Sequence, residues 1–171
     1  MTAQPIEQPA LLFQTERPGD AVAVEALIDR AFGPGRFTKV SERVREFALF
    51  RPDLSFCAWS DGELIGVVRQ YLVRIDARPL VFLGPLAVEE TARKLGAGAA
   101  LVDHACNAAQ AAGFGAVLLV GDEPFFRRNA FAAAPAAGVL MPGPVDPRRV
   151  LLRALVPGGD QGLVGPLRPP L

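Results

Sequence analysis

The stretch of sequence that decides the fold runs from Leu83 to Leu101 and reads LGPLAVEETARKLGAGAAL. An apolar run of strand length ends at Val88 and leads through a short polar turn into a helix that we expect from about Gly96 to Ala112. The start of a helix presents backbone N–H groups without intrahelical acceptors at the positive end of the helix dipole. Glycines there let a phosphate approach the backbone closely. We therefore predict that this turn binds a diphosphate-bearing cofactor.

The segments on both sides of this stretch predict a mixed sheet. Strand-like runs at 54–59 and 63–75 flank the turn Ser60-Asp61-Gly62, and Asp-Gly between apolar runs is a strong hairpin signal. The run 80–88 follows after another turn, so these segments predict an antiparallel meander. The run Ala116–Val120 has no polar alternation, which is typical of a strand buried on both faces. Strand, helix and buried strand in this order predict a right-handed parallel βαβ unit.

The remaining elements complete an α/β fold, a single-domain mixed twisted sheet with helices on both faces. We expect strands at 11–16 and 150–156, helices at 21–32 and from 40 to about 50, a short helix at 123–128, and a proline-rich connection at 132–147. The domain is predicted to span residues 10–157. Residues 1–9 read as a loose leader, and the Gly- and Pro-rich residues 158–171 as a tail of uncertain structure.

Composition narrows the class of protein. The chain has 171 residues, of which 50% are hydrophobic and 21% charged, and its formal net charge is zero. These values predict a globular domain and give no basic excess that would favour nucleic acid or an anionic membrane surface as a partner. Cys57 and Cys106 lack metal-ligand spacing, so no metal is predicted. Without a signal pattern or a membrane-length apolar run, the sequence predicts a cytoplasmic protein.

The spacing Arg93-x-x-Gly96-x-Gly98 alone leaves several functions open. Glycines at a helix start often serve only close packing of helix and strand, with no cofactor at all. The segment is not a P-loop, because the Gly-Lys-Ser/Thr ending is missing. A dinucleotide-binding fingerprint also fits poorly, because that motif belongs to the first unit of a parallel sheet and here antiparallel strands precede it.

Three segments together resemble the GNAT superfamily of N-acetyltransferases. The stretch 83–101 is similar to its acyl-CoA signature, in which a strand ending in Leu-x-Val precedes Gln/Arg-x-x-Gly-x-Gly/Ala. Gly121-Asp122-x-x-Phe125-Phe126, followed by Ala130-Phe131, resembles the Gly-Asp-x-x-Tyr-Tyr segment of a bacterial subgroup. Residues 140–147, LMPGPVDP, are similar to a proline-rich segment of that subgroup. The resemblance covers residues 10 to 157 and implies the GNAT fold.

The resemblance also implies a ligand and a reaction. It implies acetyl-CoA as cosubstrate and transfer of its acetyl group, by direct attack, to a primary amine of a small molecule or peptide. The carbonyl oxygen would be polarised by backbone near Val88. A homodimer is left open. The implied cofactor-binding residues form the strand end, the diphosphate turn and the helix start: Leu86, Ala87, Val88, Arg93, Lys94, Leu95, Gly96, Ala97, Gly98, Ala99 and Phe126.

One departure from the family pattern bears on the chemistry. Phe126 stands where the family often has a tyrosine thought to protonate the leaving thiolate, and Ala130 replaces a glycine. Phenylalanine has no proton to give, so no catalytic residue is assigned. Glu89 and Glu90 read as a solvated turn rather than as a base. Tyr71 reads as a half-buried sheet residue rather than an acceptor-site group. An alternative function is therefore a catalytically impaired acyl-CoA-binding sensor or interaction module.

Overall fold

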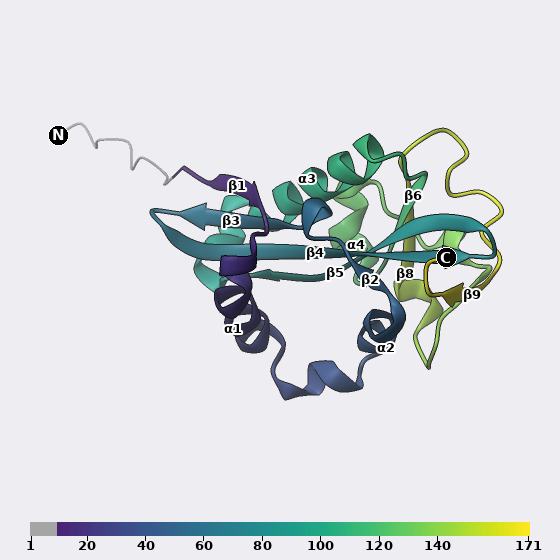
Figure 1. Ribbon diagram of the computed structural model, residues 1–171, viewed down its shortest axis with the longest axis horizontal. Helices are drawn as coiled ribbons and strands as arrows, with labels where there is room; N and C mark the ends of the chain where they lie inside the picture. Colours follow the sequence, from purple (N-terminus) through teal and green to yellow (C-terminus); the bar gives the residue numbers. More distant parts are fainter. Residues whose placement is uncertain (1–9) are drawn as a thin grey trace.

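The computed structural model describes residues 10–171, which form a mixed sheet with helices on both faces (Figure 1), as predicted. The main strand order is β1-β3-β4-β5-β6-β8. β1 pairs antiparallel with β3, β3 with β4 and β4 with β5, while β5 and β6 run parallel and β6 and β8 antiparallel. The strands are β1 Leu12–Thr15, β3 Phe56–Ser60, β4 Glu63–Ile75, β5 Arg78–Val88, β6 Ala116–Val120 and β8 Val150–Ala154.

The helices divide between the faces of the sheet. Figure 1 shows α1 (Ala21–Phe32) and α2 (Val40–Phe47) on one face and α3 (Ala97–Ala111) on the other. α3 connects β5 to β6, which confirms the predicted βαβ unit. The short helix α4 (Glu123–Phe126) follows β6. The segment Glu90–Leu95, which the sequence suggested was a plain turn, is a 3₁₀ helix.

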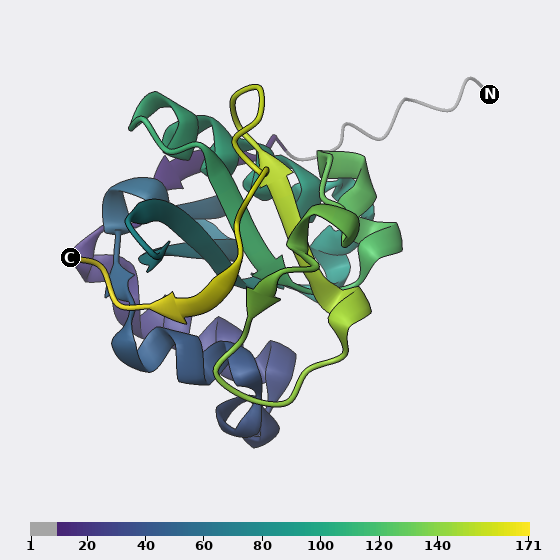
Figure 2. The same cartoon turned by 90° about the vertical axis from the view of Figure 1, so that its right-hand side faces the viewer.

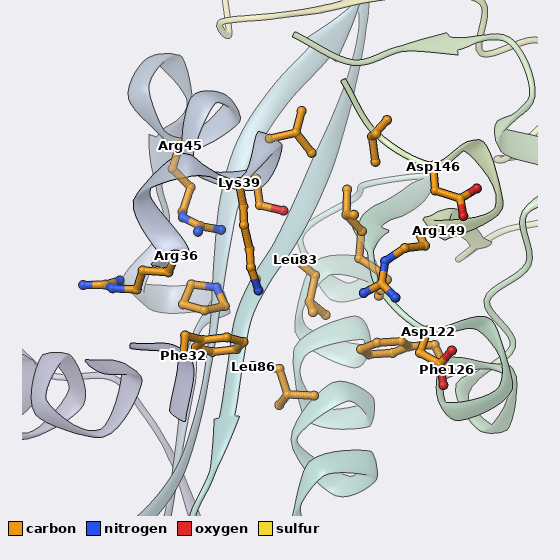
Figure 3. Close-up of a pocket in the computed structure, with 18 of the residues that line it drawn as sticks. Phe32, Arg36, Lys39, Arg45, Leu83, Leu86, Asp122, Phe126, Asp146 and Arg149 are labelled. Carbon is orange, nitrogen blue, oxygen red and sulfur yellow. The ribbon is translucent and has the colours of Figure 1, made fainter. Parts of the chain in front are cut away.

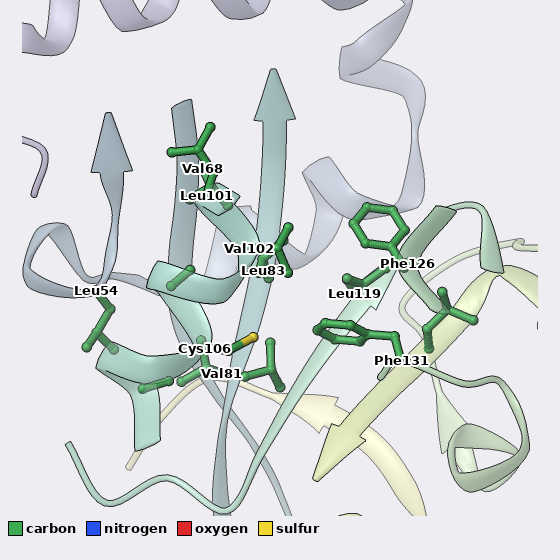
Figure 4. Close-up of a cluster of buried hydrophobic side chains, with 14 of the residues drawn as sticks. Leu54, Val68, Val81, Leu83, Leu101, Val102, Cys106, Leu119, Phe126 and Phe131 are labelled. Atoms are coloured by element: carbon green, nitrogen blue, oxygen red, sulfur yellow. The ribbon is translucent and has the colours of Figure 1, made fainter. Parts of the chain in front are cut away.

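The core between the sheet and α3 is built from small helix residues and larger strand residues (Figure 4). α3 contributes small residues together with one leucine and one valine, all fully buried: Ala97, Leu101, Val102, Ala105, Cys106 and Ala109. A Cβ on Gly66 of β4 would lie 2.9 Å from Leu101 Cδ1, so the helix lies close to the sheet at this point. On the opposite face, α1 packs Val24, Leu27 and Ile28 on the sheet, and α2 packs Val44.

The structure corrects the predicted end of the second helix. α2 ends at Phe47, not near Phe50, because Ala48 is extended with φ −76° and ψ 155°. The next residues form β2 (Leu49–Phe50), in which Leu49 pairs with Leu72 and Phe50 with Tyr71 of β4. Pairing with a sheet edge therefore outweighs the helical pattern there.

The C-terminal residues also contain strands that the sequence did not predict. β9 (Gly165–Arg168) pairs antiparallel with the end of β4 and parallel with β7 (Val139–Leu140), which lies within the proline-rich connection. Figure 2 shows β9, drawn in yellow, beside this short green strand. The tail is thus joined to the sheet, whereas the predicted leader, 1–9, lies outside the described residues.

Candidate active site

The end of β5 is a strand edge without a partner in the described part of the chain. β5 pairs with β6 only through Val81 with Val117 and Phe82 with Leu118. On its other side the pairing with β4 continues to Val88. The Glu89 N–H donates to Ile65 C=O of β4 at 2.8 Å. Because successive residues of a strand direct their backbone groups to opposite edges, the groups of Leu86 and Val88 face the open side.

A bulge precedes this open edge. Val68 of β4 pairs with Leu86 and Gln70 with Leu83, so Gly84 and Pro85 together lie opposite Arg69. An extra residue in one strand bends that strand and increases its twist. The bulge therefore lies where β5 leaves β6.

The start of α3 lies beside the open edge. Gly96 adopts a left-handed conformation, with φ 73°, and its N–H donates to Arg93 C=O at 3.4 Å. Lys94 and Leu95 belong to the preceding 3₁₀ helix. The helix geometry leaves the N–H groups of Ala97, Gly98 and Ala99 without acceptors inside α3. Among the predicted residues 94–99, these last three are the donors best placed for an anion.

A cavity of about 220 Å³ lies between β5 and the start of α3. A Cβ on Gly98 would come 3.3 Å from Phe125 Cζ and 3.7 Å from Val88 Cγ2, so this glycine keeps the cavity open. The Arg93 Nε donates to Val88 C=O at 3.4 Å, which places the guanidinium at the end of β5, in the wall of this cavity. We call this the small cavity; its lining is Ala31, Leu86, Ala87, Val88, Arg93, Gly98 and Phe125.

A larger cavity of about 600 Å³ begins where the small one ends, because Leu86 lines both. Figure 3 shows this large cavity between the α2 side and the β8 side of the molecule. Its walls come from four segments that are distant in the sequence. They are the segment from the end of α1 into α2 (Phe32, Arg36, 38–41 and Arg45), β5 (83–86), the end of β6 with α4 (119–122 and Phe126), and the turn before β8 (144–146 and Arg149). Of the predicted site residues, only Leu86 and Phe126 line it.

Three of the six charged side chains that line the large cavity are already paired. Arg36 Nη2 lies 3.0 Å from Asp29 Oδ1 and 3.1 Å from Glu25 Oε2. Arg45 pairs with Glu42 at 2.9 Å, and Asp146 pairs with Arg148 at 2.8 Å.

Three charged groups of this cavity remain unpaired. Within residues 10–171, no ion pair involves Lys39, Arg149 or Asp122. Sequence reasoning missed all three as site residues. Asp122 belongs to the Gly-Asp segment that carried part of the family resemblance, whereas Lys39 and Arg149 had only their positions, directly before α2 and before β8.

Phe126 forms one wall of the large cavity. Its side chain is nearly buried and packs edge-on against Phe125, with ring centroids 4.9 Å apart. A Cβ on Gly121 would lie 2.4 Å from Phe126 Cε2, so the glycine at the end of β6 makes room for this ring. Ala130, in the place of the family's glycine, has φ 64°, a conformation that disfavours a side chain.

The other candidate acids and bases lie elsewhere. The single tyrosine, Tyr71, lines a neighbouring cavity of about 280 Å³, and burial raises its pKa. Glu89 is ion-paired with Arg30. Burial raises the pKa of Cys57 and of Cys106 to about 12, so both thiols stay protonated at neutral pH.

Neither a metal cluster nor a membrane span was found in the part of the chain that the structure describes. No group of three or more His, Cys, Asp or Glu side chains in residues 10–171 could hold a metal ion. No helix formed by these residues combines the length and apolar character needed to cross a membrane.

Known proteins are similar to this chain in sequence and in fold. The model of the acetyltransferase (GNAT) family matches residues 21–133. The uncharacterized N-acetyltransferase YhbS of Escherichia coli is 31% identical over 127 residues, which cover 72% of this chain and 75% of YhbS. The crystal structure of YhbS in complex with CoA matches with a TM-score of 0.78 and 25% identity, covering 98% of this chain and 92% of that one. A GNAT acetyltransferase from Brucella melitensis, in complex with acetyl-CoA, matches with a TM-score of 0.61 and 25% identity, covering 85% of this chain and 97% of that one. The chain therefore belongs to the GNAT acetyltransferase family.

Proposed function

We propose that this protein transfers the acetyl group of acetyl-CoA to a primary amine by direct attack of the amine on the thioester. The observation that carries the proposal is the open edge of β5, which leads from the small cavity at the start of α3 to the large cavity. An extended ligand with amide groups and an anionic end matches this course. The named relatives crystallised with CoA or acetyl-CoA support the choice of donor.

The residues present fit this donor. The N–H groups of Ala97, Gly98 and Ala99 would bind the diphosphate, with Arg93 adding positive charge beside them. The backbone groups of Leu86 and Val88 would pair with the pantetheine amides as a neighbouring strand does. Lys94, Leu95 and Gly96 would shape the turn, and the buried Ala87 would fix the strand against α1.

The thioester end would then lie in the large cavity beside Leu86 and Phe126. Acetyl-CoA supplies an activated carbonyl carbon; a C–N bond forms there and the C–S bond breaks. The N–H groups on the open edge of β5 would stabilise the negative charge that develops on the carbonyl oxygen. Phe126 would pack on the pantetheine arm. Because a thiol has a pKa of about 8.5, its thiolate can leave without a side-chain acid and take a proton from solvent.

Asp122 would receive the amine. It is the cavity-lining carboxylate that no arginine or lysine of residues 10–171 pairs with, and it lies on the same segment as Phe126. A carboxylate there would accept a hydrogen bond from the acceptor's ammonium group and take its proton before attack. Positioning of both substrates in one cavity would supply much of the remaining rate.

A second candidate function is binding of acyl-CoA without transfer, as a sensor or interaction module. Phe126 favours it, because this side chain cannot protonate a leaving group and the single tyrosine lies outside the large cavity. Both functions require the same donor site, so donor binding alone does not separate them.

The experiment that separates them follows both products of transfer. The protein is incubated with acetyl-CoA and a panel of amines and peptides, while released thiol and N-acetylated amine are measured in parallel. An N-acetyltransferase forms both in equal amounts. Bound acetyl-CoA with slow thiol release and no acetylated product would favour the sensor. Absence of any acetyl-CoA binding, measured by calorimetry, would contradict both.

A further inference from the structure

We propose that the acceptor amine carries a second, anionic group, a carboxylate or a phosphate, and that Lys39 and Arg149 bind it from opposite walls of the large cavity. This inference rests on the proposed function, because it concerns the molecule that receives the acetyl group. It goes further by naming the chemical class of the acceptor and the residues that select it.

The charged side chains of the large cavity leave it with an excess of positive charge. Arg36 and Arg45 line the cavity but are paired with carboxylates of α1 and α2, and Asp146 is paired with Arg148. Figure 3 shows the Arg36 guanidinium turned away from the cavity. The cations of this cavity that form no ion pair within residues 10–171 are Lys39 and Arg149. Hydrogen bonds from Arg148 lower the pKa of Asp146 most, and the charge of Arg149 also helps to lower it. Together Lys39 and Arg149 outweigh the one unpaired carboxylate, Asp122, so the cavity has an excess of positive charge.

The side chains of Lys39 and Arg149 enter the large cavity from opposite walls. In Figure 3, the Lys39 side chain enters from the α2 side and that of Arg149 from the β8 side, with Leu83 and Leu86 between them. Lys39 Nζ lies 5.3 Å from the centroid of the Phe32 ring, which favours a side chain directed along this wall. Both cations thus face the same space from separate elements.

The backbone holds Arg149 in place. Its N–H donates to Asp146 C=O at 2.9 Å, and its C=O accepts the Gly121 N–H at 2.8 Å, which joins it to the end of β6. The guanidinium fork binds a carboxylate or a phosphate through two parallel hydrogen bonds, whereas the lysine ammonium acts as a point charge. Leu83, Leu86 and Leu119 form an apolar floor between the two cations, so an anionic group that enters the cavity finds no other charge on this floor.

Asp122 lines the same cavity next to Phe126, and its carboxylate would have to turn toward the cations' side to bind the amine. An amine bound at this carboxylate and an anionic group bound by Lys39 and Arg149 would belong to one molecule that carries both charges. The cavity volume of about 600 Å³, which the acetyl end of the donor shares, suits a small molecule of this kind. Amino acids and aminoalkyl phosphates have this chemistry.

The test compares amines that differ only in the anionic group. The pairs are β-alanine with its amide, and phosphoethanolamine with ethanolamine, so that the two arms separate carboxylate from phosphate. The variants Lys39→Met and Arg149→Met are compared with Arg127→Met, which removes the same charge from a side chain that is 69% exposed and outside the cavity. The ratio of kcat/KM within each pair cancels differences in donor binding.

We expect wild type and Arg127→Met to prefer the anionic member of at least one pair by about tenfold or more, and each cavity variant to lose most of that preference. Equal kcat/KM within both pairs, or a preference that the cavity variants retain, would overturn the proposal. If the same variants instead weaken transfer from succinyl-CoA while leaving the amine preference intact, the cations serve the donor and the proposal is wrong.

A binding measurement covers the case in which no amine of the panel is turned over. The N-acetylated products are titrated into the protein saturated with CoA. Tighter binding of the anionic product than of its neutral analogue, lost in Lys39→Met and Arg149→Met, would support the proposal, and equal binding would overturn it. Failure of CoA itself to bind would contradict the proposed function rather than the acceptor class.

Discussion

The two cavities along β5 are built in different ways. The small cavity takes most of its lining from one short stretch, Leu86 to Gly98, with Ala31 and Phe125 added. The large cavity is assembled from segments between Phe32 and Arg149, brought together by α2, β6 and the turn before β8. A site for a shared donor can thus be encoded locally, whereas a site for a particular acceptor depends on the whole fold.

The largest expected effect tests the small cavity. Gly98→Val places a branched side chain between Phe125 and Val88 and should abolish acetyl-CoA binding. At 100 times its Kd, the donor should stabilise the wild-type protein by about 2.7 kcal/mol, and this gain should be lost in the variant. Thermal unfolding with and without acetyl-CoA measures it.

The control is Ala111→Val, which adds a branched side chain at the exposed far end of the same helix. It should keep the full ligand-induced shift. Because Gly98 has no left-handed φ, the valine variant should fold without the ligand. An undiminished shift in Gly98→Val would show that the diphosphate lies elsewhere.

The next effect tests the large cavity alone. Asp122→Asn should lower kcat/KM by about 100-fold, since a neutral amide cannot take the amine's proton, and should leave acetyl-CoA affinity unchanged. Steady-state kinetics and calorimetry together measure the two quantities. The matched control, Glu123→Gln, changes the adjacent carboxylate, which does not line the cavity. A kcat/KM close to that of wild type in Asp122→Asn would remove this residue from the mechanism.

The elements that could be predicted from the sequence are those that local residues determine, and the elements that could not are those that depend on the whole fold. The hairpin at Asp61-Gly62, the bounds of α1 and the buried β6 were predicted because local turn chemistry and periodicity determine them. The strands β7 and β9 were missed because each is short and lies among glycines and prolines. Only pairing defines them: β9 pairs with β4 and with β7, and β7 pairs with β9. The predicted end of α2 was wrong for the same reason, because the pairing of β2 with β4 determines where this helix ends.

The site residues show the same contrast between local sequence and tertiary structure. Arg93, Gly98 and the strand end at Leu86–Val88 lie close in sequence, so a local motif could point to them. Lys39 and Arg149 are brought to one cavity by tertiary structure, and each alone reads as a surface cation. No local pattern in the sequence relates these two residues.

A smaller effect concerns the segment that follows Phe126, the aromatic wall of the large cavity. Ala130, at φ 64°, is strained by its side chain, so Ala130→Gly should raise the free energy of unfolding by about 0.5–1 kcal/mol. Ala137→Gly, at a residue with φ −59°, should instead lower it, because glycine there only adds freedom to the unfolded chain. Chemical denaturation measures both. Equal effects of the two substitutions would mean that Ala130 is not strained.

The smallest expected effect is a pH dependence of the protein's stability, caused by Glu25, which pairs with Arg36 of the large cavity. Burial raises the pKa of Glu25, but its hydrogen bonds with Arg69 and Arg36 outweigh this, so the pKa lies below its ordinary 4.5. A lowered pKa in the folded state contributes stability above the unfolded value, and that stability is lost as the pH falls through the folded value. The wild type should therefore lose more Tm than Glu25→Gln between about pH 6 and about pH 3.

The control for this pH effect is Glu63→Gln, which changes an exposed carboxylate at the start of β4. It should follow the wild-type curve. The effect should be small because the Glu25 side chain is 47% exposed and solvent screens the pairs. Identical pH curves for wild type and Glu25→Gln would contradict the assigned ion pairs.

A crystal structure with CoA bound would show most directly whether one ligand follows the open edge of β5 from the small cavity to the large one. We expect diphosphate oxygens about 3 Å from the N–H groups of Ala97, Gly98 and Ala99. We also expect pantetheine amides paired with Leu86 and Val88, and the sulfur beside Phe126 in the large cavity. A diphosphate bound away from the start of α3, or a sulfur outside the large cavity, would contradict this course of the ligand.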